Sequence, residues 1–285
     1  MRINILLIAV LLSVISVISL TNSVEAREFK ILIMQDQKGV AKKYRPLLTY
    51  LKKRGFDATI TTAPGYSDAA RMFANGTADA MFSGSGVAGC MIIKELAEPL
   101  VRPIAKDGTS TYHAVVVTRR GDEKFTGDAE YFRGKRVIFT PLASAGEFYY
   151  RSIKNIKTVN SEIEMSVSHS AALDALSRGA ADVGIIKNLV WEKDRANYPG
   201  LVKTGEDTDE NPEMCLIVSK KMDSDKSAAL AEILLALKND VSPEARKVKV
   251  NLLIQGYIPT TRTDFKHTLL LLKEAGVTKS FNFVF

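Results

Sequence analysis

Short apolar runs alternate with longer amphipathic stretches along most of the chain, and the alternation occurs in two series. The first series predicts strands at 29–34, 58–62 and 78–83, with helices at 44–53 and 67–74 between them. The second predicts strands at 136–140, 163–167 and 181–186, with helices from about 145 and over 170–177. Strands that alternate with helices are typical of an α/β fold with a mostly parallel sheet, so two such sheets are expected.

The two series contain an internal repeat. Residues 66–79 can be laid over residues 169–182 without a gap, and both copies end in Gly-x-Ala-Asp before an apolar run. In each copy one apolar stripe follows helical spacing, and a glycine is placed to stop the helix. The repeat predicts two similar lobes. It makes Tyr66 equivalent to His169, each directly before its helix, where a side chain can face the gap between the lobes.

Two apolar runs bracket the second series, at 113–118 and 214–219. We expect them to carry the chain between the lobes as two crossover strands and to form a hinge. The chain then divides into lobe 1 over 27–116, lobe 2 over 117–213, and a return strand with C-terminal helices over 214–285 that complete lobe 1.

The first 26 residues differ from the rest of the chain. They combine Arg2, an apolar run over 5–20, and small residues at Val24 and Ala26. This pattern predicts a secretory signal peptide that is cleaved after Ala26, although the run is also long enough for an uncleaved membrane anchor.

Export would permit a disulfide between the only two cysteines, Cys90 and Cys215. Each stands in an apolar run, where a free cysteine packs as a small hydrophobic residue. The bridged and the free alternatives both remain open from the sequence.

Composition and motifs narrow the function. The chain has 39 basic and 32 acidic residues and a formal net charge of +7, which weakly favours anionic partners. The basic residues are spread among acidic ones, so no nucleic-acid partner is predicted. Zinc-protease, phosphate-loop and nucleophile-elbow motifs do not occur. We therefore predict a protein that is not an enzyme and needs neither a metal nor a cofactor.

Two predicted helix starts are candidate anion sites, because backbone N–H groups and the helix dipole coincide there. Ser83 and Ser85 follow the last strand of the first series, and Ser144 and Ala145 follow the first strand of the second. Ser144 is also spaced from Glu147 as a capping box, in which both side chains bond the helix start themselves. A ligand role and a capping role for Ser144 both remain open.

Other candidate side chains surround the predicted gap. Tyr66 and Tyr112 can donate phenolic hydrogen bonds to an oxyanion, and His169 would favour its protonated form beside one. Lys187 ends the last strand of the second series and could add positive charge there.

The chain resembles the phosphate/phosphite/phosphonate periplasmic binding proteins of ABC transporters, and the likeness runs over nearly all of the sequence after the leader. The individual motifs are weak, but they occur in the family's order and spacing. They are residues 44–51, Tyr66, 76–80, 97–100, 107–108 ahead of Tyr112, 133–137, 168–169 ahead of 171–173, and 255–259.

The resemblance implies a two-lobed type II periplasmic-binding fold with the ligand in the cleft. It assigns the ligand's phosphonate group to Tyr66 and Tyr112 of lobe 1 and to Ser144 and His169 of lobe 2. It also implies a periplasmic monomer that delivers a small anion to an inner-membrane permease.

The chain departs from the family pattern at two places. The family's Ser-Thr-Ser-Gly helix start is Ala-Ser-Ala-Gly at 143–146, so a fully ionised phosphonate loses hydroxyl partners that are worth about 1.5–3 kcal/mol each. The acidic residue that some members use for an aminoalkyl group falls about where Asn211 stands, so an amine-bearing ligand is not expected, and Asn211 is itself a candidate ligand residue. A smaller or less charged oxyanion, or a different organic anion, fits these two departures better.

Other interpretations remain open from the sequence. They are a sensor that reports to a membrane kinase or chemoreceptor, a binder of another small organic anion, a binder of an unrelated molecule such as an amino acid or pyrimidine precursor, and an enzyme on the same scaffold.

Overall fold

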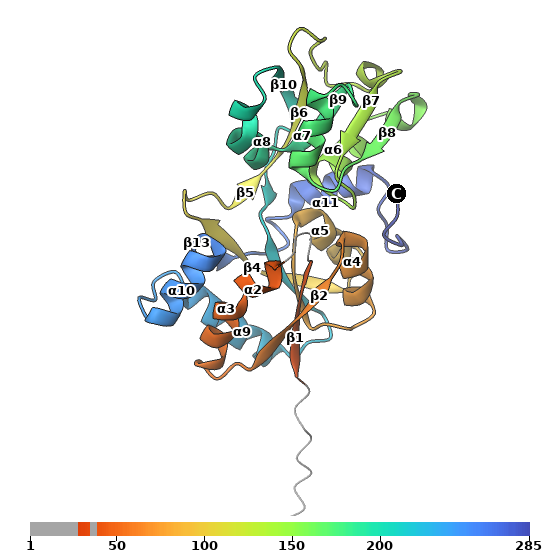
Figure 1. Cartoon of the computed structure of the whole chain (residues 1–285). Coiled ribbons are helices and arrows are strands. Elements are labelled where there is room, and N and C mark those ends of the chain that lie inside the picture. The colour runs from red at the N-terminus through yellow and green to blue at the C-terminus, as the bar shows by residue number, and fades with distance from the viewer. Residues whose placement is uncertain (1–27, 35–38) are drawn as a thin grey trace, which may run out of the picture.

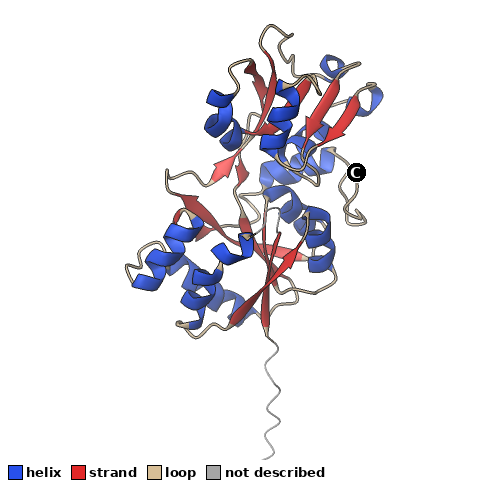
Figure 2. Cartoon of the chain, viewed as in Figure 1, coloured by secondary structure: helices blue, strands red, loops and turns tan. Residues whose placement is uncertain are grey.

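The computed structural model describes residues 28–34 and 39–285, which form two α/β lobes (Figure 1). Each lobe is built on one large sheet with helices packed on it (Figure 2). The predicted leader, residues 1–26, lies outside the described residues. Among the described helices, none is long and apolar enough to cross a membrane. The prediction of a two-lobed α/β fold is confirmed.

Lobe 1 contains a six-stranded sheet with three helices on each side. Its strands are β1 (Phe29–Met34), β2 (Ala58–Ala63), β3 (Ala80–Ser83), β4 (Ala97–Ala105), β12 (Cys215–Ser219) and β13 (Ile254–Pro259), in the spatial order β13–β4–β12–β3–β1–β2. Its main helices are α3 (Arg45–Lys52), α9 (Ser224–Ala236) and α10 (Pro243–Leu252) on one side, and α4 (Tyr66–Ala74), α5 (Ser85–Ile93) and α11 (Lys266–Glu274) on the other. A short helix, α2 (Val40–Lys43), precedes α3.

Lobe 2 contains a five-stranded sheet. Its strands are β6 (Ala114–Arg119), β7 (Arg136–Phe139), β8 (Glu162–Met165), β9 (Val183–Lys187) and β10 (Leu201–Glu206), in the spatial order β10–β6–β9–β7–β8. Its helices are α6 (Ala145–Ser152), α7 (His169–Ser177) and α8 (Asn188–Asp194), with 3-10 turns η2 (Ala129–Phe132), η3 (Ile156–Thr158) and η4 (Arg195–Asn197).

Both sheets are mixed, so the expectation of mostly parallel sheets holds only for the three strands of each series. β1 is parallel to β2 and β3, and β7 is parallel to β8 and β9. β12 and β6 are antiparallel to their neighbours. The reason is that both enter from the interlobe side: Cys215 starts β12 opposite Ser83 at the end of β3, and Ala114 starts β6 opposite Lys187 at the end of β9.

The sequence repeat is also a structural repeat. Helix α4 begins at Tyr66 and helix α7 begins at His169. Each helix ends just before a glycine, and Gly76 and Gly179 both have a φ of 75°. This left-handed conformation favours glycine and stops the helix.

The aspartate of each copy then ties the helix–strand turn to the neighbouring strand. Asp79 accepts the backbone N–H of Lys30 at 2.9 Å, and Asp182 accepts that of Arg136 at 2.9 Å. The Gly-x-Ala-Asp sequence thus has the same structural role in both lobes.

The chain passes between the lobes twice, and the two passages pair with each other. β5 (Thr111–Tyr112) and β11 (Asn211–Pro212) form a two-stranded antiparallel ribbon. The runs that were expected to cross, 113–118 and 214–219, lie mainly within the two sheets as β6 and β12. The predicted boundary after residue 116 falls inside β6.

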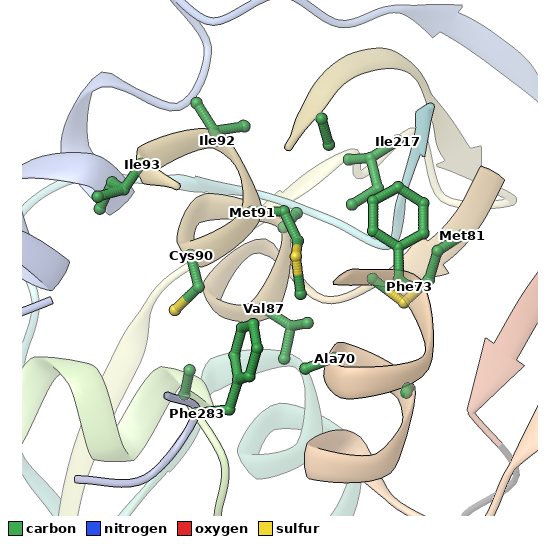
Figure 3. Close-up of a cluster of buried hydrophobic side chains, with 14 of the residues drawn as sticks. Ala70, Phe73, Met81, Val87, Cys90, Met91, Ile92, Ile93, Ile217 and Phe283 are labelled. Atoms are coloured by element: carbon green, nitrogen blue, oxygen red, sulfur yellow. The ribbon is translucent and has the colours of Figure 1, made fainter. Parts of the chain in front are cut away.

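Helix α5 forms the centre of a core that extends across the lobe boundary. All nine of its residues are buried, and Figure 3 shows Cys90 near Phe283 and Phe73 near Ile217 within this cluster. Lobe 2 contributes Leu142, Ala143 and Phe148 to the same cluster.

The two lobes are in contact where α5 begins. A Cβ atom placed on Gly86 would lie 1.7 Å from the carbonyl oxygen of Ala143, so only glycine fits at this position. Helix α11 packs against both α5 and α6, and the C-terminal helix therefore joins the lobes at the same place (Figure 1).

Cys90 and Cys215 are free and buried, which excludes the disulfide alternative for this structure. Burial raises the pKa of the Cys90 thiol to about 12. Both cysteines pack as small hydrophobic residues.

Candidate ligand-binding site

Polar side chains from both lobes meet beside the β5–β11 ribbon. The hydroxyl of Tyr112 lies 2.5 Å from Ser85 Oγ at the first residue of α5, and Lys187 Nζ lies 4.4 Å from the centre of the Tyr112 ring. Tyr112 is only 4% exposed. Burial raises the pKa of Tyr112, the Ser85 hydrogen bond partly opposes this, and Glu213 and Tyr66 add to it. The phenol therefore keeps its proton and can donate a hydrogen bond.

Lys187 does not stand as a free positive charge. Its ammonium group forms an ion pair with Glu213, and each side chain is 19% exposed. The position of the family's acidic residue corresponds to Asn211, whereas the structure brings Glu213, two residues further on, to the site. The expectation that no carboxylate is available there is wrong, because the turn after β11 directs Glu213 toward lobe 2.

His169 supplies a buried polar atom from lobe 2. Its Nδ1 is shielded from solvent and has no hydrogen-bond partner among the described residues. Burial, and then the positive charge of Lys187, lower the pKa of His169 to about 4. The imidazole is therefore neutral at pH 7, in contrast to the protonated form expected beside an anion.

A cavity of about 380 Å³ lies between the lobes. Tyr66 lines it from lobe 1, and Thr140 and Ser166 line it from lobe 2. Thr140 is 4% exposed, and its Oγ1 has no hydrogen-bond partner within the described part of the chain. Thr140 and Ser166 follow the parallel strands β7 and β8, and the carboxyl ends of such strands are where α/β sheets bind ligands.

Backbone N–H groups at the start of α6 are hydrogen-bonded by the side chains of Ser144 and Glu147. Ser144 Oγ accepts the backbone N–H of Glu147 at 3.3 Å, and Glu147 Oε2 accepts that of Ala143 at 2.7 Å. Glu147 is 2% exposed, and its Oε1 accepts hydrogen bonds from Arg151 at 3.1 Å. The capping role of Ser144 is therefore present in the structure, and Ala145 is buried behind it.

The chain can now be placed among known proteins. A family model described as "ABC transporter, phosphonate, periplasmic substrate-binding protein" matches residues 29–265. The chain belongs to this family. It is a periplasmic solute-binding protein that works with an ABC transporter and binds a small ligand, and it is not an enzyme.

Solved structures of low sequence identity share the fold. XAC2383 from Xanthomonas citri bound to chloride ion is 17% identical, with a TM-score of 0.72 over 87% of this chain and 97% of that chain. PhnD1 from Prochlorococcus marinus in complex with methylphosphonate is 15% identical, with a TM-score of 0.67 over 86% and 97%. A binding protein component of the ABC phosphonate transporter of Pseudomonas aeruginosa, PA3383, is 13% identical, with a TM-score of 0.64 over 87% and 84%.

Among curated proteins, none is significantly similar to this periplasmic binding protein in sequence. The structural likenesses above, all under 25% identity, therefore bear on its fold alone.

Two predicted ligand residues of this binding protein form hydrogen bonds within the chain. Ser83 Oγ donates to the carbonyl oxygen of Gly84 at 2.9 Å, and Asn211 Oδ1 accepts from Thr268 of α11 at 2.6 Å. Ser83 nevertheless lines an apolar pocket of about 90 Å³ that it shares with Tyr66. Asn211 is completely buried and lines neither the cavity nor this pocket.

The structure thus gathers Ser85, Tyr112, His169 and Lys187 near the ribbon and places Tyr66 on the cavity. Thr140, Ser166 and Glu213 were not predicted from the sequence. The rule that polar residues follow the carboxyl ends of parallel strands would have indicated Thr140 and Ser166.

Proposed function

We propose that this periplasmic binding protein captures a small phosphonate-type oxyanion of low charge between its lobes. The observation that carries the proposal is the pair of buried atoms without partners, Thr140 Oγ1 and His169 Nδ1, on the lobe 2 side. A buried polar atom without a hydrogen bond is costly, so ligand oxygens that bond these atoms would be favoured. Tyr66 faces the cavity from the other lobe.

The charges of the site favour a singly charged ligand. Lys187 is paired with Glu213, His169 is neutral, and Glu147 occupies the start of α6. The remaining donors are hydroxyl groups and the imidazole, which compensate the lost hydration of a dianion poorly.

A small apolar pocket beside Tyr66 suits an alkyl substituent. The pocket, of about 90 Å³, is lined by Met34, Val87 and Met214 among others. This volume accommodates a methyl-sized group, and the structural relative PhnD1 was solved with methylphosphonate. Methylphosphonate is therefore our first candidate ligand.

A second candidate, an aminoalkyl phosphonate, is favoured by the Lys187–Glu213 pair. A zwitterionic ligand could exchange partners with this pair, its phosphonate taking Lys187 and its ammonium taking Glu213. This exchange would keep the local charge balanced.

Calorimetric titration of the wild type and Glu213→Gln with methylphosphonate and with 2-aminoethylphosphonate distinguishes the two candidates. If methylphosphonate is the ligand, freeing Lys187 should tighten its binding about tenfold or more, because a charge-assisted bond is gained. If the aminoalkyl compound is the ligand, the variant should bind it about tenfold more weakly. Glu210→Gln, which removes an exposed partner of His113, serves as the control. Binding of neither anion, with stabilisation by neutral compounds only, would remove the proposal.

The mature form and its partner complete the proposal. We infer that the signal peptide is cleaved after Ala26 and that the monomer delivers its ligand to an inner-membrane ABC permease. A mass of the periplasmic protein that still includes residues 1–26 would contradict cleavage. Ligand uptake that is unchanged when the gene for this protein is deleted would favour the sensor alternative.

A further inference from the structure

The outer helices of lobe 1 carry the chain's excess of positive charge. Segments 40–57 and 238–252 contain ten basic and three acidic residues, a formal charge of +7. The complete chain also has a net charge of +7, so the rest of it is balanced. We call these two segments the basic flank. Its cations are Lys42, Lys43, Arg45, Lys52, Lys53, Arg54, Lys238, Arg246, Lys247 and Lys249.

The two segments form one continuous surface. Helices α3 and α10 pack against each other (Figure 1). Lys53, at the end of α3, pairs with Glu244 in the first turn of α10, and Arg54 pairs with Asp240 just before it. The end of α3 therefore lies beside the start of α10.

The internal ion pairs leave most of the flank's charge uncompensated. Lys52 pairs with Asp57 at 3.6 Å, so all three acidic residues of the flank are used by three of its cations. The other seven cations form no salt bridge with an acidic side chain among residues 28–34 and 39–285. They are Lys42, Lys43, Arg45, Lys238, Arg246, Lys247 and Lys249, and all but Lys249 are exposed.

Exposed aliphatic side chains lie among these cations. Val241 is 76% exposed, and Val250 and Leu253 are each 62% exposed. Val241 precedes α10, Val250 follows Lys249 in its last turn, and Leu253 comes directly after the helix. Arg246 donates a hydrogen bond to the carbonyl oxygen of Val241. Cations that surround exposed aliphatic groups are typical of surfaces that lie on lipid headgroups.

The flank faces away from the lobe boundary. α3 and α10 cover the sheet face opposite to α5 and α11, the helices that meet lobe 2. Contact through the flank would leave the interlobe cavity accessible.

We propose that the basic flank binds the surface of a bilayer that contains anionic phospholipids. The seven unpaired cations would contact lipid phosphates, and Val250 and Leu253 would enter the headgroup layer. This binding is separate from ligand capture and would hold the protein near membrane-embedded partners.

Co-sedimentation with vesicles tests the proposal, using protein purified from the periplasmic fraction. The vesicles are phosphatidylcholine alone or phosphatidylcholine with about one-third phosphatidylglycerol. The test variant is Lys42→Glu/Lys247→Glu. The matched control, Lys154→Glu/Lys193→Glu, makes the same charge change at exposed positions of lobe 2. Thermal unfolding confirms that each variant is folded.

We expect the wild type and the control to bind the phosphatidylglycerol vesicles at low ionic strength and to be released by high salt. The test variant should bind these vesicles at least about tenfold more weakly, because each cation near an anionic membrane surface contributes to the free energy of binding. Weak binding of the wild type to these vesicles, or an equal loss in the control, would overturn the proposal. Loss of binding in Val250→Asp with both lysines intact would further support it.

Discussion

At the scale of single residues, His169 illustrates how burial sets the chemistry of the site. Its place at the start of α7 follows from the repeat, but its protonation state follows from its surroundings. Burial and the nearby Lys187 lower its pKa to about 4, against an ordinary value near 6.5. A neutral ring offers one nitrogen as donor and the other as acceptor. It therefore suits a ligand with both protonated and unprotonated oxygens, such as a phosphonate monoanion.

The depressed pKa of His169 also makes stability depend on pH. Between about pH 6.5 and 4 the unfolded chain binds a proton at this residue and the folded chain does not, so stability should fall as the pH is lowered through this range. The expected loss in the free energy of unfolding is about 2 kcal/mol relative to His169→Gln. This is less than the free energy that corresponds to the full pKa shift, because the His169 side chain is only partly buried. Urea unfolding of both proteins at a series of pH values measures the difference. Parallel curves for the two proteins would contradict the assignment.

At the scale of elements, the contact between α5 and the turn before α6 fixes how the lobes meet. Gly86 touches the backbone of Ala143, whereas nothing lies within 4 Å of a Cβ placed on Gly84, two residues earlier. These neighbouring glycines therefore provide a matched pair for testing the interlobe contact.

Gly86→Ala should force the lobes apart at this contact, since the new Cβ would meet backbone rather than a flexible side chain. We expect a loss of about 1–3 kcal/mol in the free energy of unfolding, together with weaker ligand binding. Gly84→Ala should leave the free energy of unfolding nearly unchanged. Calorimetry and chemical unfolding measure the two quantities, and equal effects of the two substitutions would contradict the described packing.

Helix α11 is tied to the segment before β11 by a second histidine. His267 Nε2 lies 2.8 and 2.9 Å from the two carboxylate oxygens of Asp207, and Nδ1 lies 3.7 Å from Asp209. Burial alone would lower the pKa of His267, but Asp207, Asp209 and Glu274 outweigh it, and the pKa is raised.

The sign of this pH dependence is opposite to that of His169. The pKa of His267 is higher in the folded protein than in the unfolded chain, where it is near 6.5. The resulting stabilisation is complete below pH 6.5 and is lost as the pH rises through the pKa of the folded protein. His267→Gln should therefore cost more stability at pH 6 than at pH 8.5. Unfolding free energies of the wild type and variant at the two pH values check this. An equal or larger cost at pH 8.5 would show that the Asp207 contact is not an ion pair.

At the scale of the whole molecule, the pattern of apolar residues predicted the helices and strands, which depend on neighbouring residues in the sequence. Each lobe contains a helix, a glycine and a strand in the same order. The spacing of apolar residues predicts the helix, and the glycine, with its left-handed φ, marks the helix end. Tyr66 and His169 were therefore placed correctly at their helix starts. The crossing was not located, because β5 and β11 have two residues each, too few to show a periodicity.

The site was predicted only in part for a related reason. The pairing of Lys187 with Glu213, and the neutral state of His169, depend on how two lobes meet, which no local pattern records. The places of Thr140 and Ser166 at the ends of predicted strands made them candidates, but that they lie on neighbouring strands depends on the order of β7 and β8 in the sheet. The basic flank likewise joins segments that are far apart in the sequence.

The central claim is that an oxyanion lies between the lobes on hydroxyl and imidazole groups. A crystal structure of the protein with methylphosphonate tests it most directly. We expect phosphonate oxygens within about 3 Å of Thr140 Oγ1, His169 Nδ1 and the Tyr66 hydroxyl. Methylphosphonate bound on another surface, under conditions where calorimetry shows one saturated site, would contradict it.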